Sequence, residues 1–527
     1  MLAFFAIDLL LLMLPSKLMI TGHEGDLMHL ADAALRMASG ERPHIDFMTP
    51  IGILGFAPVA GFLALGVPIG KATLLAGASI LALMLPIIWW VAATRFSKGQ
   101  AYYFASIMVI TMMAVVYGGG SNAISLSMYY NRWGWSIAFL VLATILFAPH
   151  RKLGETWVAP LVIGLGMATL AMLKMTFFVP LFLALPIILL AKKQGRLLLK
   201  AVVVGLVAGG AALLILGPDF FLAYLGDLLA VMRPESSRVN TGVSLSDLVA
   251  SSKTIVTSII LFAALILFRK TGHMHQGLVV LVLAPTFAYI TYQNWGNDPK
   301  WLHLVILYIW VNLPNADAKN VFGLPGRQGA LALIVAAITI SIPSVFSMAT
   351  SPIRVALALK TDGFIKVEMI DGTSDIWLPE RKATNIYGVE AMSGWPTLSP
   401  HLEPLIIAGR QFPDCSLEGS TILGLYSGMA AQLEASESVR GRPVLVADVL
   451  SFLWIMGDID RVKGAAPWYY GDDSGVAGAE FIAVPFCPAK PALRSAMMGE
   501  IEKGGYELSE VLQTELMVLY RISKPAE

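Results

Sequence analysis

The sequence is poor in charged residues and in cysteine. Only 14% of its 527 residues are charged and 56% are hydrophobic, which excludes an ordinary soluble globular protein. The formal net charge is +1, so the basic excess of a nucleic-acid-binding protein is missing and no nucleic acid is expected as a partner. The two cysteines, Cys415 and Cys487, either pair or remain free thiols, and the sequence leaves both options open.

Other familiar signals are missing as well. The N-terminus lacks a basic region and a small-residue cleavage site, so its apolar start is interpreted as an uncleaved first span. The C-terminal part has no nucleotide-binding glycine motif, and the chain has no internal repeat or low-complexity tract. The missing repeat counts against a transporter, because many transporters are built from paired repeats.

Long apolar runs fill the first two thirds of the chain. A helix needs ~20 mainly apolar residues to cross a membrane. The segments that meet or nearly meet this requirement are 3–20, 72–94, 101–117, 134–149, 156–173, 175–191, 200–216, 253–269, 276–293, 300–314 and 328–348. A further apolar stretch, 51–66, is short and rich in Gly and Pro, so we predict a re-entrant or juxtamembrane helix there. Residues 1–350 are therefore expected to form an all-α membrane domain with about eleven spans.

Lysine and arginine in the short loops indicate the orientation. They gather in five loops, at Arg95 and Lys98, Arg151 and Lys152, Lys192 to Lys200, Arg269 and Lys270, and Lys319 and Arg327. Placing these loops in the cytoplasm puts the N-terminus inside. It puts the loops 118–133, 217–252 and 294–299 outside, together with everything after 349. An arrangement with twelve spans and an inverted first span is the alternative.

The last third of the chain, 351–527, alternates β-rich apolar runs with helical patterns, which is typical of a soluble α/β domain. The expected strands cover 443–449, 481–486 and 516–522, and the expected helices cover 420–435 and 491–503. We therefore predict a polytopic membrane domain followed by a soluble α/β domain.

The first outer loop, predicted over 21–50, is rich in acidic and histidine side chains. Apolar residues recur from Glu24 to Ser39 with the spacing of an amphipathic helix that ends at Gly40. Such a helix is expected to lie along the membrane surface. Its polar face carries Asp26, His29, Asp32 and Arg36. Asp32 and Arg36, four residues apart, are predicted to form an ion pair on the helix face.

The loop continues with Gly40, Pro43, Asp46 and Phe47 in the pattern Gly-x-x-Pro-x-x-Asp-Phe. With the acids before it, this stretch resembles the first outer loop of the GT-C superfamily of membrane glycosyltransferases, which use polyprenyl-phosphate sugars. The resemblance is to the protein mannosyltransferase and aminoarabinose transferase group. That family's loop opens with an acidic pair, and Glu24 matches its second acid. His23 stands where the first acid is usual, and Asp26 is a candidate replacement.

The resemblance implies a function. A sugar would pass from a polyprenyl-phosphate donor to a glycan, lipid or protein acceptor at the outer face of a bacterial inner membrane, among membrane lipids. A carboxylate would act as general base. Glu24 is the first candidate for this base and Asp26 the second, while Asp46 and His23 are candidates for positioning the loop or binding a metal. No cofactor is certain. A divalent cation (Mg²⁺ or Mn²⁺) stays open, because His23, Glu24, Asp26 and His29 offer mixed ligands without a recognised metal spacing.

The leaving lipid phosphate would need cations or backbone amides. Four outer-face residues are candidates for donor phosphate binding: Arg132, Lys174, Lys300 and His303. Each also has a structural interpretation, as a basic side chain that reaches the interface or as a buried histidine with its hydrogen bonds satisfied.

Other functions remain open alternatives. A transporter or flippase for a lipid-linked sugar would share the membrane domain. A polysaccharide polymerase or ligase would share the donor but depend on outer Arg and His residues. His23 in place of an acid keeps a catalytically inactive family member open as well.

Overall fold

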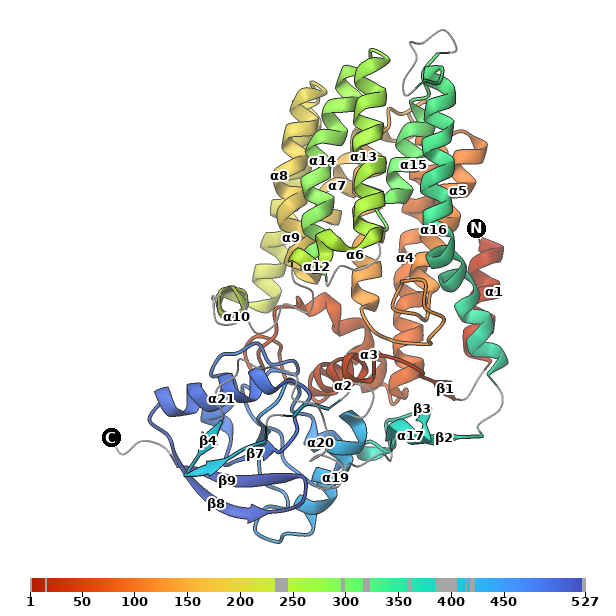
Figure 1. The fold of residues 1–527 in the computed structure, drawn as a ribbon. Helices are drawn as coiled ribbons and strands as arrows, with labels where there is room; N and C mark the ends of the chain where they lie inside the picture. Colours follow the sequence, from red (N-terminus) through yellow and green to blue (C-terminus); the bar gives the residue numbers. More distant parts are fainter. Residues whose placement is uncertain are drawn as a thin grey trace.

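A computed structural model describes most of the chain (Figure 1). The described residues are 2–14, 17–232, 245–294, 299–315, 323–358, 362–383, 405–413, 415–417 and 422–523. A bundle of apolar helices forms one half of the molecule, and the C-terminal residues form a smaller body at one end of it. The architecture is the predicted one, an all-α membrane part followed by an α/β part.

Eleven described helices correspond to the predicted spans. They are α1 (Leu2–Met13), α4 (Ile69–Arg95), α5 (Lys98–Met113), α6 (Tyr129–Leu146), α7 (Glu155–Leu173), α8 (Met175–Ala191), α9 (Gly195–Leu216), α13 (Ser252–Lys270), α14 (Met274–Gln293), α15 (Leu302–Val311) and α16 (Gly326–Leu357). Six helices in the described part of the chain are long and apolar enough to cross a membrane: α4, α7, α9, α13, α14 and α16. The chain is therefore a multi-pass membrane protein.

The first predicted span, 3–20, is only partly helical. Helix α1 ends at Met13, and strand β1 (Leu18–Met19) follows a short gap in the described residues. Strand β1 pairs in parallel with β3 (Ile376–Pro379), which pairs in turn with β2 (Phe364–Lys366). The prediction of a full helix was wrong here. The backbone N–H groups of Leu18 and Ile20 donate to carbonyls of Asp375 and Trp377, so this apolar segment forms a strand.

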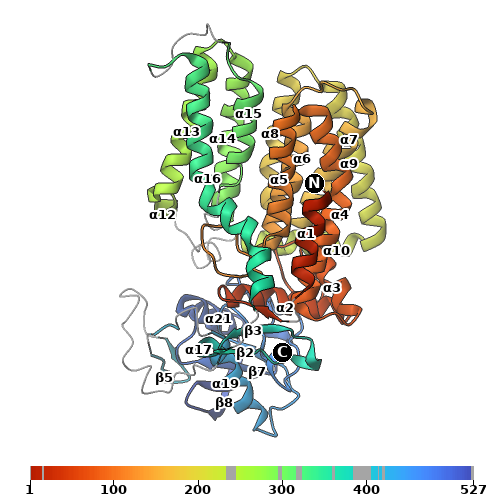
Figure 2. The same ribbon diagram turned by 90° about the vertical axis from the view of Figure 1, so that its right-hand side faces the viewer.

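The first outer loop lies between the bundle and the C-terminal body in both views (Figures 1 and 2). It contains α2 (Glu24–Ala38), which confirms the predicted amphipathic helix, followed by η1 (Ile53–Gly55) and α3 (Ala57–Ala64). At 1.5 Å per residue, α3 is about 12 Å long, which is too short to cross a bilayer. Two further helices, α10 (Pro218–Val231) and α12 (Leu245–Ala250), belong to the loop 217–252. Residues 233–244 of that loop and 295–298 lie outside the described residues.

A glycine fixes this loop against the bundle. The Gly52 N–H donates to the Leu173 carbonyl at 3.1 Å. A Cβ at Gly52 would lie only 2.1 Å from the Met172 carbonyl oxygen, so only glycine allows this approach. Ile51 and Lys174 form an isolated antiparallel bridge at the same place. The turn between α7 and α8 is thereby brought beside the first outer loop.

The C-terminal body is built around a four-stranded sheet of order β6-β7-β9-β8. Strands β6 (Val444–Val446) and β7 (Phe481–Pro485) are parallel, while β9 (Met517–Ser523) is antiparallel to both β7 and β8 (Glu507–Gln513). The other elements are η2 (Ile370–Gly372), α17 (Glu380–Ala383), β4 (Ile406–Ile407), β5 (Arg410–Gln411), α19 (Ile422–Glu434), α20 (Leu453–Met456), η3 (Val476–Gly478) and α21 (Pro491–Lys503). The three predicted strands and two predicted helices are confirmed. The boundary expected at 350 falls inside α16, which continues through Pro352 to Leu357.

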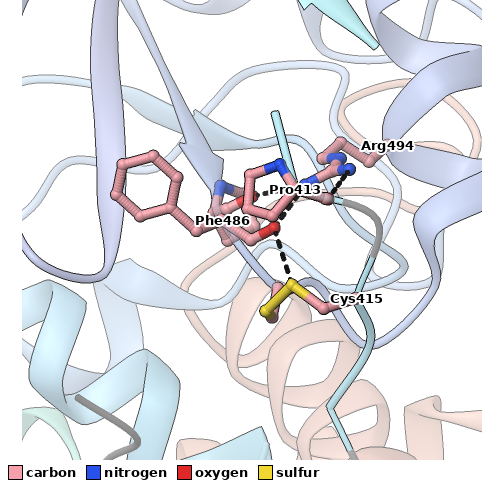
Figure 3. The surroundings of a disulfide bond; sticks show 6 residues. Pro413, Cys415, Phe486 and Arg494 are labelled. Atoms are coloured by element: carbon pink, nitrogen blue, oxygen red, sulfur yellow. Dashed lines mark hydrogen bonds between the residues drawn. A yellow bond between two sulfur atoms is a disulfide. The ribbon is translucent and has the colours of Figure 1, made fainter. Parts of the chain in front are cut away.

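Cys415 and Cys487 form a disulfide, with 5.0 Å between their Cα atoms (Figure 3). The bond joins the segment 415–417 to the residues that follow β7. Arg494 of α21 holds the same two segments, since its guanidinium donates to the Pro413 carbonyl at 3.0 Å and to the Phe486 carbonyl at 2.5 Å. The sequence left open whether the two cysteines pair, and in the structure they do.

The polar face of α2 packs against the C-terminal body. Arg36 Nε lies 2.6 Å from Asp32 Oδ1, which confirms the predicted ion pair, and both side chains are about 1–2% exposed. Trp454 Nε1 donates to the same Asp32 oxygen at 3.0 Å, and Arg36 Nη1 donates to the Val462 carbonyl at 3.3 Å. The sequence did not predict that α20 and the segment after it cover this face of the helix.

Candidate functional site

Asp26 lies in the first turn of α2 and faces the membrane helices. Ser127, one residue before Met128 and α6, donates its hydroxyl to Asp26 Oδ2 at 2.6 Å. Burial raises the pKa of Asp26 above its ordinary value, while the Ser127 hydrogen bond and the positive charges of His23 and Lys174 act in the opposite direction. A carboxylate in this setting is a stronger base than one in water.

Lys174 lies between α7 and α8, outside both helices, with an extended backbone (φ −164°). Its ammonium donates to Asn131 Oδ1 at 2.9 Å and to Asn294 Oδ1 at 2.7 Å, and it lies 4.9 Å from the centre of the Tyr130 ring. Burial lowers the pKa of Lys174 to about 7, against the opposing effect of Asp26. The structure thus brings together one predicted acid and one predicted cation.

His29 lies on the same face of α2 as Asp26, three residues further on. Its ring centre is 5.8 Å from that of Phe56 and 5.7 Å from that of Trp468, which belongs to the C-terminal body. Burial, with a contribution from Lys174, lowers the pKa of His29 to about 3, so the ring is neutral at physiological pH. Its Nε2 atom and the Asn131 Nδ2 atom are buried and have no hydrogen-bond partner in the described part of the chain.

Glu24, the first candidate for the base, is engaged elsewhere. Its carboxylate lies 2.5 Å from Lys382 Nζ of α17, and only 4% of the Glu24 side chain is exposed. Lys382 also donates to the Thr21 carbonyl at 3.1 Å. The geometry gives Glu24 a role in attaching the first outer loop to the C-terminal body, which favours Asp26 as the candidate base.

Arg132 and Lys300 hold the backbone of the loop between α5 and α6. Arg132 donates to the carbonyls of Val116, Ser127 and Ala114, the last at 3.0 Å. Lys300 Nζ donates to the Gly118 carbonyl at 3.0 Å. Both side chains are buried, so in this conformation they shape the loop that carries Ser127.

His303 has a hydrogen-bond partner of its own. Its Nδ1 lies 2.9 Å from the Tyr103 hydroxyl, which joins α15 to α5. This arrangement matches the structural interpretation of His303 as a buried histidine with a hydrogen-bond partner. Of the four predicted phosphate-binding residues, Lys174 is the one whose charge acts on the pKa of Asp26.

Asp46 and His23 were candidates for positioning the loop or binding a metal. Asp46 Oδ2 accepts a hydrogen bond from the Arg42 N–H at 2.7 Å, and the Asp46 carbonyl accepts one from the Gly464 N–H at 2.8 Å. His23 precedes α2 with a left-handed backbone (φ 62°), and its ring lies 4.8 Å from that of Tyr117. No three His, Cys, Asp or Glu side chains gather to hold a metal within the described ranges. The divalent cation stays a prediction.

The sequence predictions missed several residues of the site. Ser127, Tyr130 and Asn131 occur in a stretch where only Arg132 was singled out, and Asn294 begins a loop where only Lys300 and His303 were. Neutral amides and hydroxyls carry no signal in a single sequence, and their roles depend on which acid or cation faces them.

Comparisons with known proteins are sparse. No family model and no curated protein matches the chain. The crystal structure of ArnT from Cupriavidus metallidurans in the apo state is similar over 98% of this chain and 97% of that one, with a TM-score of 0.40 and 12% sequence identity. A TM-score of this size establishes neither a shared family nor a shared activity.

Proposed function

We propose that this protein is a membrane glycosyltransferase of the GT-C type, which moves a sugar from a polyprenyl-phosphate donor to a hydroxyl of an acceptor at the outer membrane surface. The observation that supports it most is that a partly buried acid, Asp26, and a partly buried cation, Lys174, lie near enough for each to shift the pKa of the other. They meet where the first outer loop, the α7–α8 turn and the C-terminal body come together. A lipid donor would reach this point from the bilayer, and an acceptor from the outer side.

The reaction assigns one task to each group. The acceptor oxygen attacks the anomeric carbon and its proton passes to the Asp26 carboxylate, which acts as general base. The bond between the anomeric carbon and the phosphate oxygen breaks, and the lipid phosphate leaves as an anion. The Lys174 ammonium offsets the negative charge that grows on this leaving group. Attack from the face opposite the phosphate inverts the configuration at the anomeric carbon.

The contacts of the other predicted cations bear on the alternatives. A polymerase or ligase that depends on outer Arg and His residues would need Arg132 and His303 available to substrate. Arg132 donates hydrogen bonds to three backbone carbonyls, and His303 contacts Tyr103. A transporter would need its charged groups near the bilayer centre, whereas Asp26 and Lys174 lie at one end of the bundle. The transferase accounts for more of the site than either alternative.

The test separates the two candidate bases. Membranes containing the protein, or its Asp26→Asn or Glu24→Gln variant, are supplied with a panel of polyprenyl-phosphate sugars and a cell-envelope extract. Release of free polyprenyl phosphate is measured. We expect Asp26→Asn to lower the rate by about 10²-fold or more, because it removes the general base. Glu24→Gln should lower it less than tenfold, because Glu24 makes a structural ion pair.

The control is the amount of folded protein, measured by size-exclusion chromatography in detergent. The double variant Glu24→Ala/Asp26→Ala should have no activity while it still elutes as folded protein. Full activity in this double variant, or no release by the unmodified protein from any donor of the panel, would contradict the proposal.

A further inference from the structure

One segment of the C-terminal body, residues 461–472, follows the first outer loop toward the candidate site. Arg461 pairs with Glu41 at 3.1 Å, and the Val462 carbonyl accepts a hydrogen bond from Arg36. The Gly464 N–H then donates to the Asp46 carbonyl at 2.8 Å. These contacts attach the start of the segment to the loop, so its later residues are delivered to the face of α2 that carries His29 and Asp26.

The later residues read Trp468-Tyr469-Tyr470-Gly471-Asp472. Tyr469 is buried and fixes the backbone, since its N–H donates to the Val449 carbonyl at 2.8 Å and its hydroxyl to the Asp472 carbonyl at 2.5 Å. Trp468 and Tyr470, on either side of it, are only half-buried. Trp468 lies against the neutral ring of His29. The C-terminal body thus adds two partly accessible aromatic side chains to the site.

The charges near these aromatic side chains differ from those near Lys174. Burial raises the pKa of Tyr470, and the carboxylates of Asp26, Asp472 and Asp227 raise it further. Lys174 instead contacts the amide oxygens of Asn131 and Asn294 and lies 4.9 Å from the centre of the Tyr130 ring, and its charge also acts on His29. We call the surroundings of Lys174 the cationic side, and the surroundings of Trp468 and Tyr470, on which three carboxylates act, the acidic, aromatic side. A phosphate is favoured beside the ammonium and repelled beside the carboxylates.

The acidic, aromatic side has the features of a sugar subsite. Aromatic rings offer an apolar face for the C–H groups of a sugar ring, and ionised carboxylates accept hydrogen bonds from its hydroxyls. The buried His29 Nε2, which has no partner in the described part of the chain, can donate or accept depending on the tautomer. A hydroxyl group can meet either role, whereas a phosphate oxygen can only accept.

We infer that Trp468 and Tyr470, with His29, form the acceptor subsite and that the acceptor is a neutral carbohydrate rather than a phosphorylated or anionic one. This inference rests on the proposed function and gives its acceptor a chemical class. The cationic side with Lys174 is left for the lipid phosphate. The C-terminal body then has a direct part in choosing the substrate.

Binding is the test, because it does not require a donor. The full-length protein, purified in detergent and labelled with a fluorophore, is applied to an array of neutral oligosaccharides and of their phosphorylated and uronic-acid counterparts. We expect retention on neutral glycans and a signal at least tenfold lower on the anionic counterparts. Trp468→Ala and Tyr470→Ala should each reduce the neutral-glycan signal about tenfold, from the loss of one aromatic face.

Three further variants make the result decisive. Tyr470→Phe keeps the ring and should retain most of the binding, which guards against a misfolded alanine variant. Tyr506→Ala, an aromatic substitution elsewhere in the C-terminal body, should leave binding unchanged. Asp26→Asn keeps a side-chain oxygen that accepts a hydrogen bond, so it should keep binding while it loses transfer. Failure of the acceptor subsite and failure of the catalytic assignment therefore give different results.

Three results would overturn the inference. They are retention on anionic glycans alone, neutral-glycan binding that the Trp468 and Tyr470 alanine variants leave intact, and no glycan retained by the unmodified protein. If binding fails but Asp26→Asn abolishes transfer, the transferase stands without this subsite. If binding behaves as expected but transfer never occurs, the site is a glycan-binding site.

Discussion

Lys174 is the residue whose ionisation should show most clearly in the pH dependence of activity. A lysine carries its charge below its pKa, and here burial lowers that pKa to about 7. The ammonium is thus present at pH 6 and mostly absent at pH 8. If the charge stabilises the leaving phosphate, activity is lost as the pH rises through this value. On the acid side, activity is lost as the pH falls through the raised pKa of Asp26, because the base becomes protonated.

The corresponding prediction concerns the pH profile of kcat/KM between pH 5.5 and 9.5. Above about pH 7 we expect the value to fall up to tenfold per unit. Lys174→Arg should move this alkaline fall upward by at least ~2 units, because a guanidinium stays charged, although its different shape should lower the maximum rate. A profile whose alkaline side is the same in both proteins would remove Lys174 from the reaction.

Single residues also show where prediction from sequence stops. The acids of the first outer loop stood out because charge is rare in this chain. The choice between Glu24 and Asp26 did not follow from the sequence, since it depends on Lys382, which lies 358 positions away from Glu24 in the chain. Asn131 and Asn294 were missed for the same reason: their contribution to the site comes from the lysine that they contact.

Among the elements, α2 connects the membrane helices to the C-terminal body. Its helical period was readable from local sequence, and so were the strands β6, β7 and β9, because apolar spacing reports on each element by itself. The segments that pack on an element cannot be predicted from the sequence of that element alone. The sequence predicted the ion pair on the polar face of α2, but it did not predict that Trp454 and Val462 contact this face.

A prediction follows for the ion pair in this interface. Arg36→Met leaves the buried Asp32 without its cation, which should lower the free energy of unfolding by about 3–5 kcal/mol. Replacing both partners, as in Asp32→Leu/Arg36→Met, should cost less than Arg36→Met alone, because no unpaired charge remains buried. Both effects are measured by thermal unfolding in detergent, with the protease resistance of the C-terminal body as the readout.

The exposed pair of Arg410 and Glu510 provides the comparison. Their side chains are 30% and 41% exposed, so Arg410→Ala should change stability by no more than about 1 kcal/mol. A double variant of Asp32 and Arg36 that is less stable than Arg36→Met would show that the pair contributes net stability in the interface.

At the scale of the whole molecule, the orientation can be predicted from two independent features. Basic residues gather in the loops assigned to the cytoplasm, and the C-terminal body contains a disulfide, which persists in oxidising compartments. Both are expected of a C-terminal body outside the cytoplasm. A phosphatase that is active only outside, fused after residue 527, should therefore be active.

The matched control is the same phosphatase fused after Gln194, in the loop with the strongest basic cluster, where it should be inactive. An inactive C-terminal fusion at normal expression would reverse the orientation and place Asp26 on the cytoplasmic side.

The pairing of β1 with β3 sets a condition on the order of biosynthesis. Leu18 meets Ile376, which the ribosome adds 358 residues later. At 5–20 residues per second, the start of the chain waits roughly 20 to 70 s for its partner strand. The helices of the bundle can enter the bilayer during this interval, but the first outer loop cannot complete its contacts. The candidate site therefore assembles last, and a chain that stops before residue 376 would be inserted in the membrane and remain without its active conformation.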